Sequence, residues 1–155
     1  MRRIDREITD INEIEKIIAQ SYACRIGLVD KDMPYVVALN FGYVKGSPAK
    51  LYFHCGVEGK KLDLIARNNN ACFQFDINPE IIVGEKACGF SMKYQSVIGF
   101  GKIRRVESEQ EKIEALNAIM KQYTGKAEYE YNPKILQVTV ALRLDIDSIS
   151  GKQKT

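Results

Sequence analysis

The sequence predicts an α+β protein, mainly β, in which antiparallel strands form a closed or split barrel. Runs of β-branched and aromatic residues predominate, and the early runs are joined by links as short as "KDMP", a length typical of hairpins. Helical patterns do not alternate regularly with strands, as a doubly wound parallel sheet requires. The 155 residues, 45% of them hydrophobic, fit one domain with a core of ordinary size, so we expect residues 1–155 to form a single domain.

Three segments have the pattern of helices. The first, "TDINEIEKIIAQ", places Asp10 and Glu13 at capping-box spacing and repeats isoleucine at the helical period. The second, "KKLDLIARNNN", is short and ends at the asparagines. The third, "SEQEKIEALNAIMKQYTG", has a capping box at Ser108 and Glu111 and a stop at Gly125. We expect its buried stripe to consist of Ile113, Leu116, Met120 and Tyr123.

The strands are predicted from β-branched and apolar runs. They are, in order, "ACRIGLVD", "PYVVALNFGYV", "KLYFHC", "ACFQFDI", "QSVIGFGKIRRV" and "ILQVTVALRLDIDSI". Segment 78–94 has no clear period, and we expect a loop that contains a short strand. Gly99 and Gly101 interrupt the fifth strand and indicate barrel curvature, a bulge or a close backbone approach.

Charge and cysteine content disfavour several classes of function. Twenty-three Lys and Arg against twenty Asp and Glu give a net charge of +3 without a basic block, so we expect no nucleic-acid partner. With one His and no CxxC pair we expect no metal site, and reduced thiols at Cys24, Cys55, Cys72 and Cys88. No segment approaches the roughly 18 apolar residues of a membrane span, and the charged N-terminus lacks a signal core. We therefore expect a cytoplasmic protein with no membrane partner.

The stretch "LYFHCGVEGKKLDLI" indicates an anion-binding site. Lys60 and Lys61 fall in the first turn of the predicted helix, where unpaired N–H groups and the positive end of the dipole favour an anion. Two cations there are repelled by the positive end of the helix dipole, and a bound phosphate would turn this repulsion into a net attraction. The alternative is that both lysines extend into water, with Glu58 partly compensating their charge. The loop is not a P-loop, and no helix follows "GFG", so ATP and NAD sites of the usual types are disfavoured.

Other polar residues are candidates for the same site. His54 and Cys55 are neighbours on a predicted strand, so they point to opposite faces and cannot act together as nucleophile and base. His54 is either a packed, hydrogen-bonded residue or a partner of whatever the lysines bind. Arg25 begins an apolar strand and requires the barrel mouth, a carboxylate or a phosphate. Gln95 and Ser96 offer hydrogen-bonding groups at the start of another strand.

Together these segments resemble the FMN-binding split-barrel proteins related to pyridoxamine 5′-phosphate oxidase, most closely the nitroimidazole-resistance branch. The resemblance covers nearly the whole chain. It is carried by "DREITD" at 5–10, "CRIGLVD" at 24–30, "PYVVALNFGY" at 34–43, "LYFHCGVEGKK" at 51–61, "SVIGFGK" at 96–102, "EALNAIMKQYTG" at 114–125 and "DIDSISGK" at 145–152. It implies a six-stranded antiparallel split barrel with flanking helices, forming a homodimer with two FMN sites at the subunit interface.

The resemblance also implies which residues hold the cofactor. In such proteins basic residues bind the flavin phosphate, and the matching positions here are Arg25, Lys60 and Lys61. The FMN phosphate is then the anion that Lys60 and Lys61 would bind. This phosphate loop has no hydroxyl residue, so lysines and backbone N–H groups would carry more of the binding than in the oxidases.

The flavin ring has its own matching positions. The strand through Asn40 and the strand through Phe53 and His54 would border the isoalloxazine ring. Gln95 and Ser96 would reach the flavin from the partner subunit. His54 is the candidate catalytic residue, because an imidazole there could donate a hydrogen bond to the reduced flavin or to a substrate oxygen.

Two hypotheses for function remain open. The chain has no His after residue 54 and ends "SISGKQKT", so it lacks the substrate-binding residues of a pyridoxamine phosphate oxidase. The first hypothesis is an FMN-dependent oxidoreductase that reduces a small organic acceptor, such as a nitroaromatic, with electrons from an unidentified donor. The second is a flavin- or haem-binding module without turnover, in which His54 would be an axial ligand.

Overall fold

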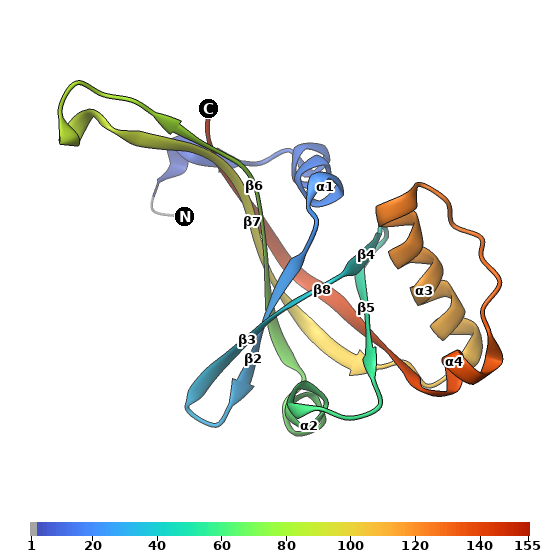
Figure 1. The fold of residues 1–155 in the computed structure, drawn as a ribbon. Helices are drawn as coiled ribbons and strands as arrows, with labels where there is room; N and C mark the ends of the chain where they lie inside the picture. The colour runs from blue at the N-terminus through green and yellow to red at the C-terminus, as the bar shows by residue number, and fades with distance from the viewer. Residues whose placement is uncertain (1–2) are drawn as a thin grey trace.

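The sheet determines the architecture of this protein. The computed structural model describes residues 3–155, which form one antiparallel sheet of eight strands with four α-helices around it (Figure 1). The strands follow the order β3-β2-β6-β7-β8-β5-β4, and β1 also pairs with β8. The mainly β, antiparallel α+β fold predicted from the sequence is confirmed. The sheet has eight strands rather than six, because β1 is additional and the second predicted strand is divided in two.

The bounds of the elements are as follows. The strands are β1 (Glu7–Ile8), β2 (Cys24–Asp30), β3 (Met33–Leu39), β4 (Phe41–Val44), β5 (Lys50–Gly56), β6 (Asn70–Ile82), β7 (Ser91–Arg105) and β8 (Thr139–Lys154). The helices are α1 (Ile11–Gln20), α2 (Lys60–Arg67), α3 (Glu109–Thr124) and α4 (Pro133–Gln137). Two short 3-10 turns cover Ile4–Arg6 and Ala87–Gly89.

The barrel is split between β3 and β4. These strands follow one another in the chain, yet they lie at opposite ends of the strand order. The chain therefore passes from one edge of the sheet to the other at Asn40, an exposed residue between the two strands. Covalent connection, rather than a ladder of hydrogen bonds, joins these edges.

Aromatic residues fill the core between the sheet and α1. Phe41, Phe53, Phe73 and Phe75 are fully buried, and the rings of Phe41 and Phe75 lie 4.8 Å apart between centroids. Burial of each such side chain contributes about 1.5–3 kcal/mol. Helix α1 adds Ile14, Ile17 and Ile18 to the same core and is capped by the Asp10 carboxylate, which accepts a hydrogen bond from the Asn12 N–H at 2.9 Å.

Helix α3 packs on the sheet through small residues. Its predicted caps are confirmed, since the Ser108 Oγ accepts from the Glu111 N–H at 3.1 Å and Gly125 has a φ of 74°. The predicted stripe was wrong in part: the buried side chains are Ala115 and Ile119, Leu116 is half-buried and packs against them, Ile113 and Met120 are half-buried, and Tyr123 is exposed. The reason is close approach of the two backbones, because a Cβ at Gly42 would meet backbone atoms of Ala118 and Ile119.

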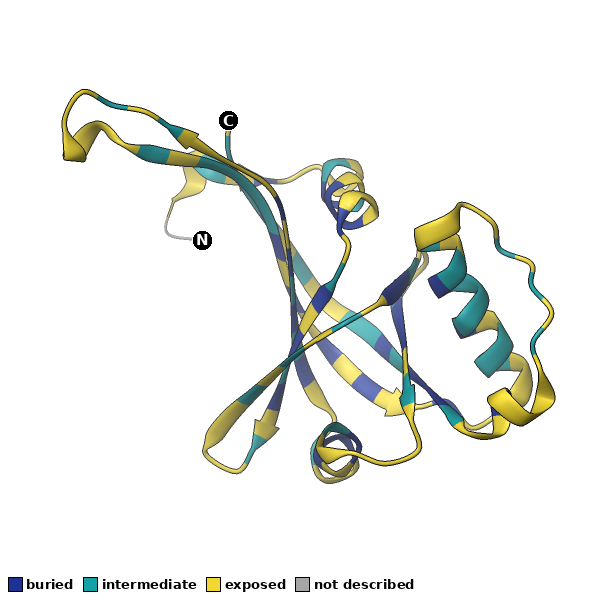
Figure 2. Cartoon of the chain, viewed as in Figure 1, coloured by how far each residue is buried: buried dark blue, intermediate teal, exposed yellow. Residues whose placement is uncertain are grey.

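Two segments differ from the sequence-based expectation. At 78–94, where a loop with a short strand was expected, residues 83–90 lie outside the strands, and β6 and β7 continue on both sides as a hairpin arm, with Ile81 paired to Met92, after a register shift between Ile77 and Glu80. Figure 1 shows this arm extending beyond the body, and Figure 2 shows that it is mostly exposed. The last strand starts at Thr139 rather than Ile135, because Pro133 favours the first turn of α4 and Asn132 caps it.

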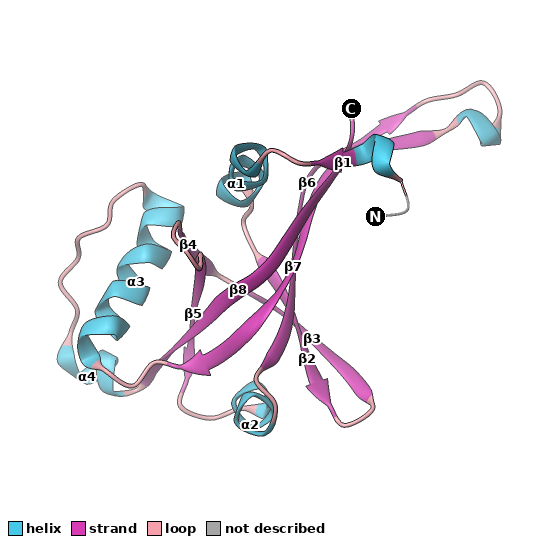
Figure 3. Cartoon of the chain, turned by 180° about the vertical axis from the view of Figure 1, so that it is seen from behind, coloured by secondary structure: helices cyan, strands magenta, loops and turns pink. Residues whose placement is uncertain are grey.

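Gly99 and Gly101 of β7 are associated with both a bulge and a close approach of neighbouring atoms. The β7–β8 register shifts between Phe100 and Gly101, so a bulge is present. A Cβ at Gly99 would meet the Phe73 ring, and one at Gly101 would meet the Asp145 carbonyl, so both positions also require close approach. Seen from behind, β8 runs through the middle of the sheet between β7 and β5 (Figure 3). No helix in residues 3–155 is both long enough and apolar enough to span a bilayer.

Candidate functional site

The N-terminus of α2 is built to leave backbone donors free. Strand β5 ends at Gly56, and the chain enters the helix through Gly59, whose φ of 142° is suited only to glycine. Gly59 has no side chain with which to cap the helix. The first N–H groups of α2 are therefore available to an external acceptor, at the positive end of the helix dipole.

Lys60 links this helix to the β2–β3 hairpin. Its Nζ lies 2.6 Å from Asp30 Oδ2 and 5.2 Å from the centroid of the Tyr35 ring. The hydrogen bond from Lys60 lowers the pKa of the Asp30 carboxyl. Lys61 is half-buried and makes no ion pair with residues 3–155. Sequence analysis did not identify Asp30 or Tyr35 as partners of Lys60, although Asp30 ends one of the quoted motifs.

His54 and Cys55 point to opposite faces of β5, as predicted. His54 is exposed, whereas Cys55 packs against the core, and burial raises the pKa of its thiol. Phe53 is fully buried, so its ring has no surface for a ligand and only its backbone could border one. Asn40 is exposed in the break between β3 and β4 rather than within a strand.

Arg25 is separated from the two lysines within the chain. Its Nη1 donates to Asp76 Oδ1 at 2.5 Å and to Gln74 Oε1 at 3.3 Å, so a carboxylate is the partner it has here. Along β2 it lies five residues from Asp30, about 17 Å at strand rise. Arg25 and Asp30 also point to opposite faces of β2, because exposed and buried residues alternate along the strand. The three cations predicted to share one phosphate are thus not one cluster in a single chain.

Gln95 and Ser96 are neighbours on β7, so their side chains point to opposite faces, and only Ser96 lies on the same face as Arg25. Ser96 is in register with Asp76, the partner of Arg25, and its Oγ donates to the Lys152 carbonyl at 3.5 Å. The Gln95 side chain donates to Gln153 Oε1 at 3.2 Å. These groups and the lysines of α2 therefore form two separate sets.

The outer face of the sheet carries an exposed apolar surface that sequence analysis did not identify. Val29, Val36, Ile98 and Phe100 are 42%, 64%, 43% and 56% exposed. Beside them is a cavity of about 540 Å³, lined by Cys72, Phe100 and the β2–β3 hairpin. The sequence does contain a signal for this surface, because β2 and β7 have apolar residues on both faces, a pattern typical of strands covered on both sides.

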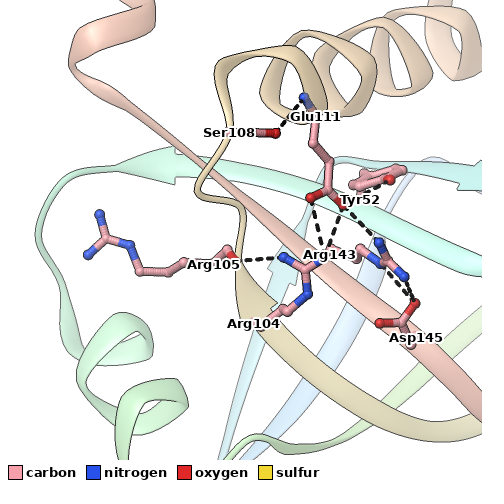
Figure 4. Close-up of polar contacts among 7 residues, drawn as sticks. All are labelled: Tyr52, Arg104, Arg105, Ser108, Glu111, Arg143 and Asp145. Carbon is pink, nitrogen blue, oxygen red and sulfur yellow. Dashed lines mark hydrogen bonds and ion pairs between the residues drawn. The ribbon is translucent and has the colours of Figure 1, made fainter.

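A second polar cluster, also missed, fixes the start of α3 to the sheet (Figure 4). The Glu111 carboxylate accepts from Arg143 at 2.9 Å and from Arg104 at 3.1 and 3.2 Å. Burial raises the pKa of Glu111, but the hydrogen bonds from these arginines outweigh it, so the pKa lies below its ordinary value. Arg143 also binds Asp145 at 2.6 Å, and this carboxylate raises the pKa of the guanidinium.

Comparison with known families decides the assignment. The family model for pyridoxamine 5′-phosphate oxidase matches residues 10–153. The chain belongs to this family. The resemblance found in the sequence is therefore confirmed. None of the proteins with curated functions matches the chain.

Three solved structures resemble this chain in fold, and one of them also exceeds 30% identity. A protein of Bacteroides thetaiotaomicron VPI-5482 named for 5-nitroimidazole antibiotic resistance is 34% identical, with a TM-score of 0.83 over 95% of this chain and 86% of its own. The FAD and haem binding protein of Mycobacterium smegmatis is 20% identical, with a TM-score of 0.83 over 96% and 73%. The flavocytochrome Anf3 of Azotobacter vinelandii is 17% identical, with a TM-score of 0.81 over 100% and 72%. The last two likenesses concern the fold alone.

All four cysteines are free in the part of the chain that the structure describes. Residues 3–155 contain no cluster of His, Cys, Asp and Glu that could hold a metal ion.

Proposed function

We propose that this protein binds FMN and uses it to reduce a small organic acceptor, such as a nitroaromatic compound. The observation that carries the proposal is the pair Lys60 and Lys61 at the uncapped N-terminus of α2. Family membership and 34% identity to a protein named for 5-nitroimidazole resistance support it.

The residues of α2 fit a phosphate monoester. Two ammonium groups and the N–H groups that precede Leu62 supply donors for the phosphate, although Asp63 is an acidic residue of the same turn. Lys60 would exchange Asp30 for the phosphate, and because the Lys60 side chain is 56% exposed, solvent screens this ion pair and the exchange costs little. Lys61, which has no carboxylate partner in residues 3–155, needs no such exchange.

The site is proposed to be completed by a second copy of the chain. The exposed apolar side chains of the outer face, Val29, Val36, Ile98 and Phe100, need a cover, and the same surface on a partner is apolar. Arg25 and Ser96 border this face, so in a homodimer they would approach the partner rather than the lysines of their own chain. If one FMN contacts both sets of residues, Arg25 and Ser96 would come from one subunit and Lys60 and Lys61 from the other.

His54 is the proposed catalytic residue. Bound FMN would supply the electron and hydride transfer, with an unidentified donor to reduce it. The exposed imidazole on β5 can donate a hydrogen bond or a proton to a reacting oxygen, and no side chain needs to act as a nucleophile. Cys55 is excluded from that role because it faces the core.

Absorption spectroscopy of the purified protein, with FMN titration, tests the proposal. We expect a flavin band near ~450 nm, and about ten-fold weaker FMN binding in Lys60→Ala or Lys61→Ala, each losing one charge-assisted contact. Lys121→Ala, which removes an exposed cation of α3, is the matched control and should bind FMN normally. A band near ~400 nm that disappears in His54→Ala would instead support the haem-binding module. Unchanged FMN affinity in both lysine variants would refute the phosphate assignment.

A further inference from the structure

A groove with an excess of positive charge lies at the other end of α2. It has a volume of about 500 Å³ and runs between the last turn of the helix and the end of β7. Three arginines line it, Arg67 from α2 and Arg104 and Arg105 from β7, and no carboxylate does. We call it the arginine groove.

Two of the three guanidinium groups form no ion pair among the described residues, although Arg67 is close enough for its charge to help lower the pKa of the Asp30 carboxyl. Arg104 is held by Glu111, whereas Arg67 and Arg105 form no ion pair with residues 3–155. Figure 4 shows the Arg105 side chain extended away from Glu111. Arg67 is favoured by the negative end of the α2 dipole, but Arg105 has no such compensation. Like charges lining one groove repel each other unless an anion lies between them.

The remaining walls add amide donors and an apolar floor. Asn68 uses its Oδ1 to accept from the Asn70 N–H at 3.0 Å, which leaves its amide N–H groups free to donate. The Asn69 carbonyl accepts from the Ile103 N–H at 2.8 Å and fixes the two walls together. Leu62 and Ile65 form the floor.

We propose that the arginine groove binds a ligand of the nucleotide class, with its phosphate groups on Arg67 and Arg105. Guanidinium forks match phosphate oxygens in a bidentate manner, and amide donors supplement them. A free phosphate ion would fill only a small part of about 500 Å³, whereas a volume of this size is ordinary for an organic ligand. The apolar floor gives such a ligand's ring a surface on which to lie.

The arginine groove and the proposed FMN phosphate site lie at opposite ends of α2. Helix α2 has eight residues, so its ends are separated by about 12 Å, with Lys60 at one end and Arg67 at the other. The inference therefore goes beyond the proposed function and does not require that FMN bind.

The test is calorimetric titration of the full chain with ADP, with and without saturating FMN. We expect binding in both conditions, weakened about ten-fold in Arg67→Ala and in Arg105→Ala. Arg105→Lys should give intermediate affinity, because it keeps the charge but loses the fork. Lys121→Ala and Lys60→Ala should bind ADP as the wild type does. Both arginines are exposed, so unchanged thermal unfolding of the variants should show that folding is intact.

Three results would overturn the inference. The first is the absence of ADP binding, and the second is ADP binding that both arginine variants retain. The third is ADP binding lost in Lys60→Ala, which would place the nucleotide at the N-terminus of α2. Adenosine and pyrophosphate separate the two halves of the ligand: we expect no measurable binding of adenosine and weaker binding of pyrophosphate than of ADP. Equal affinity for pyrophosphate and ADP would make the groove a simple anion site and refute the nucleotide class.

Discussion

Replacing Glu111 with glutamine should weaken the attachment of α3 to the sheet. The substitution keeps the shape of the side chain but removes the charge that accepts from Arg104 and Arg143. Hydrogen bonds to a charged group contribute about 1.5–3 kcal/mol each, but Arg104 is 44% exposed and solvent screens its part. With Arg143 at 21% and Glu111 at 20% exposure, we expect Glu111→Gln to lower the free energy of unfolding by about 1–2 kcal/mol at neutral pH.

The effect should depend on pH in a defined direction. The pKa of Glu111 in the folded protein lies below its ordinary value of 4.5. A carboxyl whose pKa is lowered by folding contributes stability that is fully present above the unfolded pKa and is lost as the pH falls through the folded pKa. The difference between wild type and Glu111→Gln should therefore be constant above about pH 5 and should shrink below about pH 4.

Urea unfolding at fixed protein concentration, at several pH values, measures this. Glu114→Gln is the matched control, because Glu114 is an exposed residue of the same helix that forms no ion pair with residues 3–155. It should change the free energy of unfolding little at any pH. An equal loss in Glu111→Gln and Glu114→Gln, or a difference that persists unchanged at pH 3, would contradict the role given to the Glu111 cluster.

Three further predictions concern the sheet and its two faces. Gly101→Ala should destabilise the protein by about 1–3 kcal/mol, because the new Cβ meets the Asp145 carbonyl, whereas Gly56→Ala, in open space, should have little effect on the urea midpoint. His54→Ala should retain FMN but reduce the acceptor more slowly, and loss of the flavin colour would show that His54 holds the cofactor. Phe100→Glu should convert the proposed dimer to a monomer in sedimentation velocity, because it places a charge on the apolar outer face; an unchanged dimer would move the interface elsewhere.

The helix ends could be predicted from the sequence because their physical signals are local. The caps of α1 and α3 were readable because the capping residue and the helix lie within a few positions of each other. The start of α2 at Lys60 was readable for the same reason, since the glycine, the lysines and the helix are adjacent.

Features that depend on distant segments could not be predicted. The apolar run through Asn40 has no turn signal, so its division between two sheet edges became visible only in the strand order. The stripe of α3 was misassigned because the sequence does not show that Gly42 lets the helix backbone approach β4. The arginine groove joins Arg67 to Arg105 only because β6 and β7 pair as a long hairpin.

The position of β8 has a consequence for biosynthesis. It follows every other strand in the chain, yet it pairs with β7, β5 and β1 and so joins both halves of the sheet. While the ribosome is still making residues 139–154, β4 and β5 have no partner in the rest of the sheet, and β7 has an open edge. Such edges invite pairing with other chains. The nascent protein therefore depends on rapid completion, or on a chaperone, until β8 takes its place between the two halves.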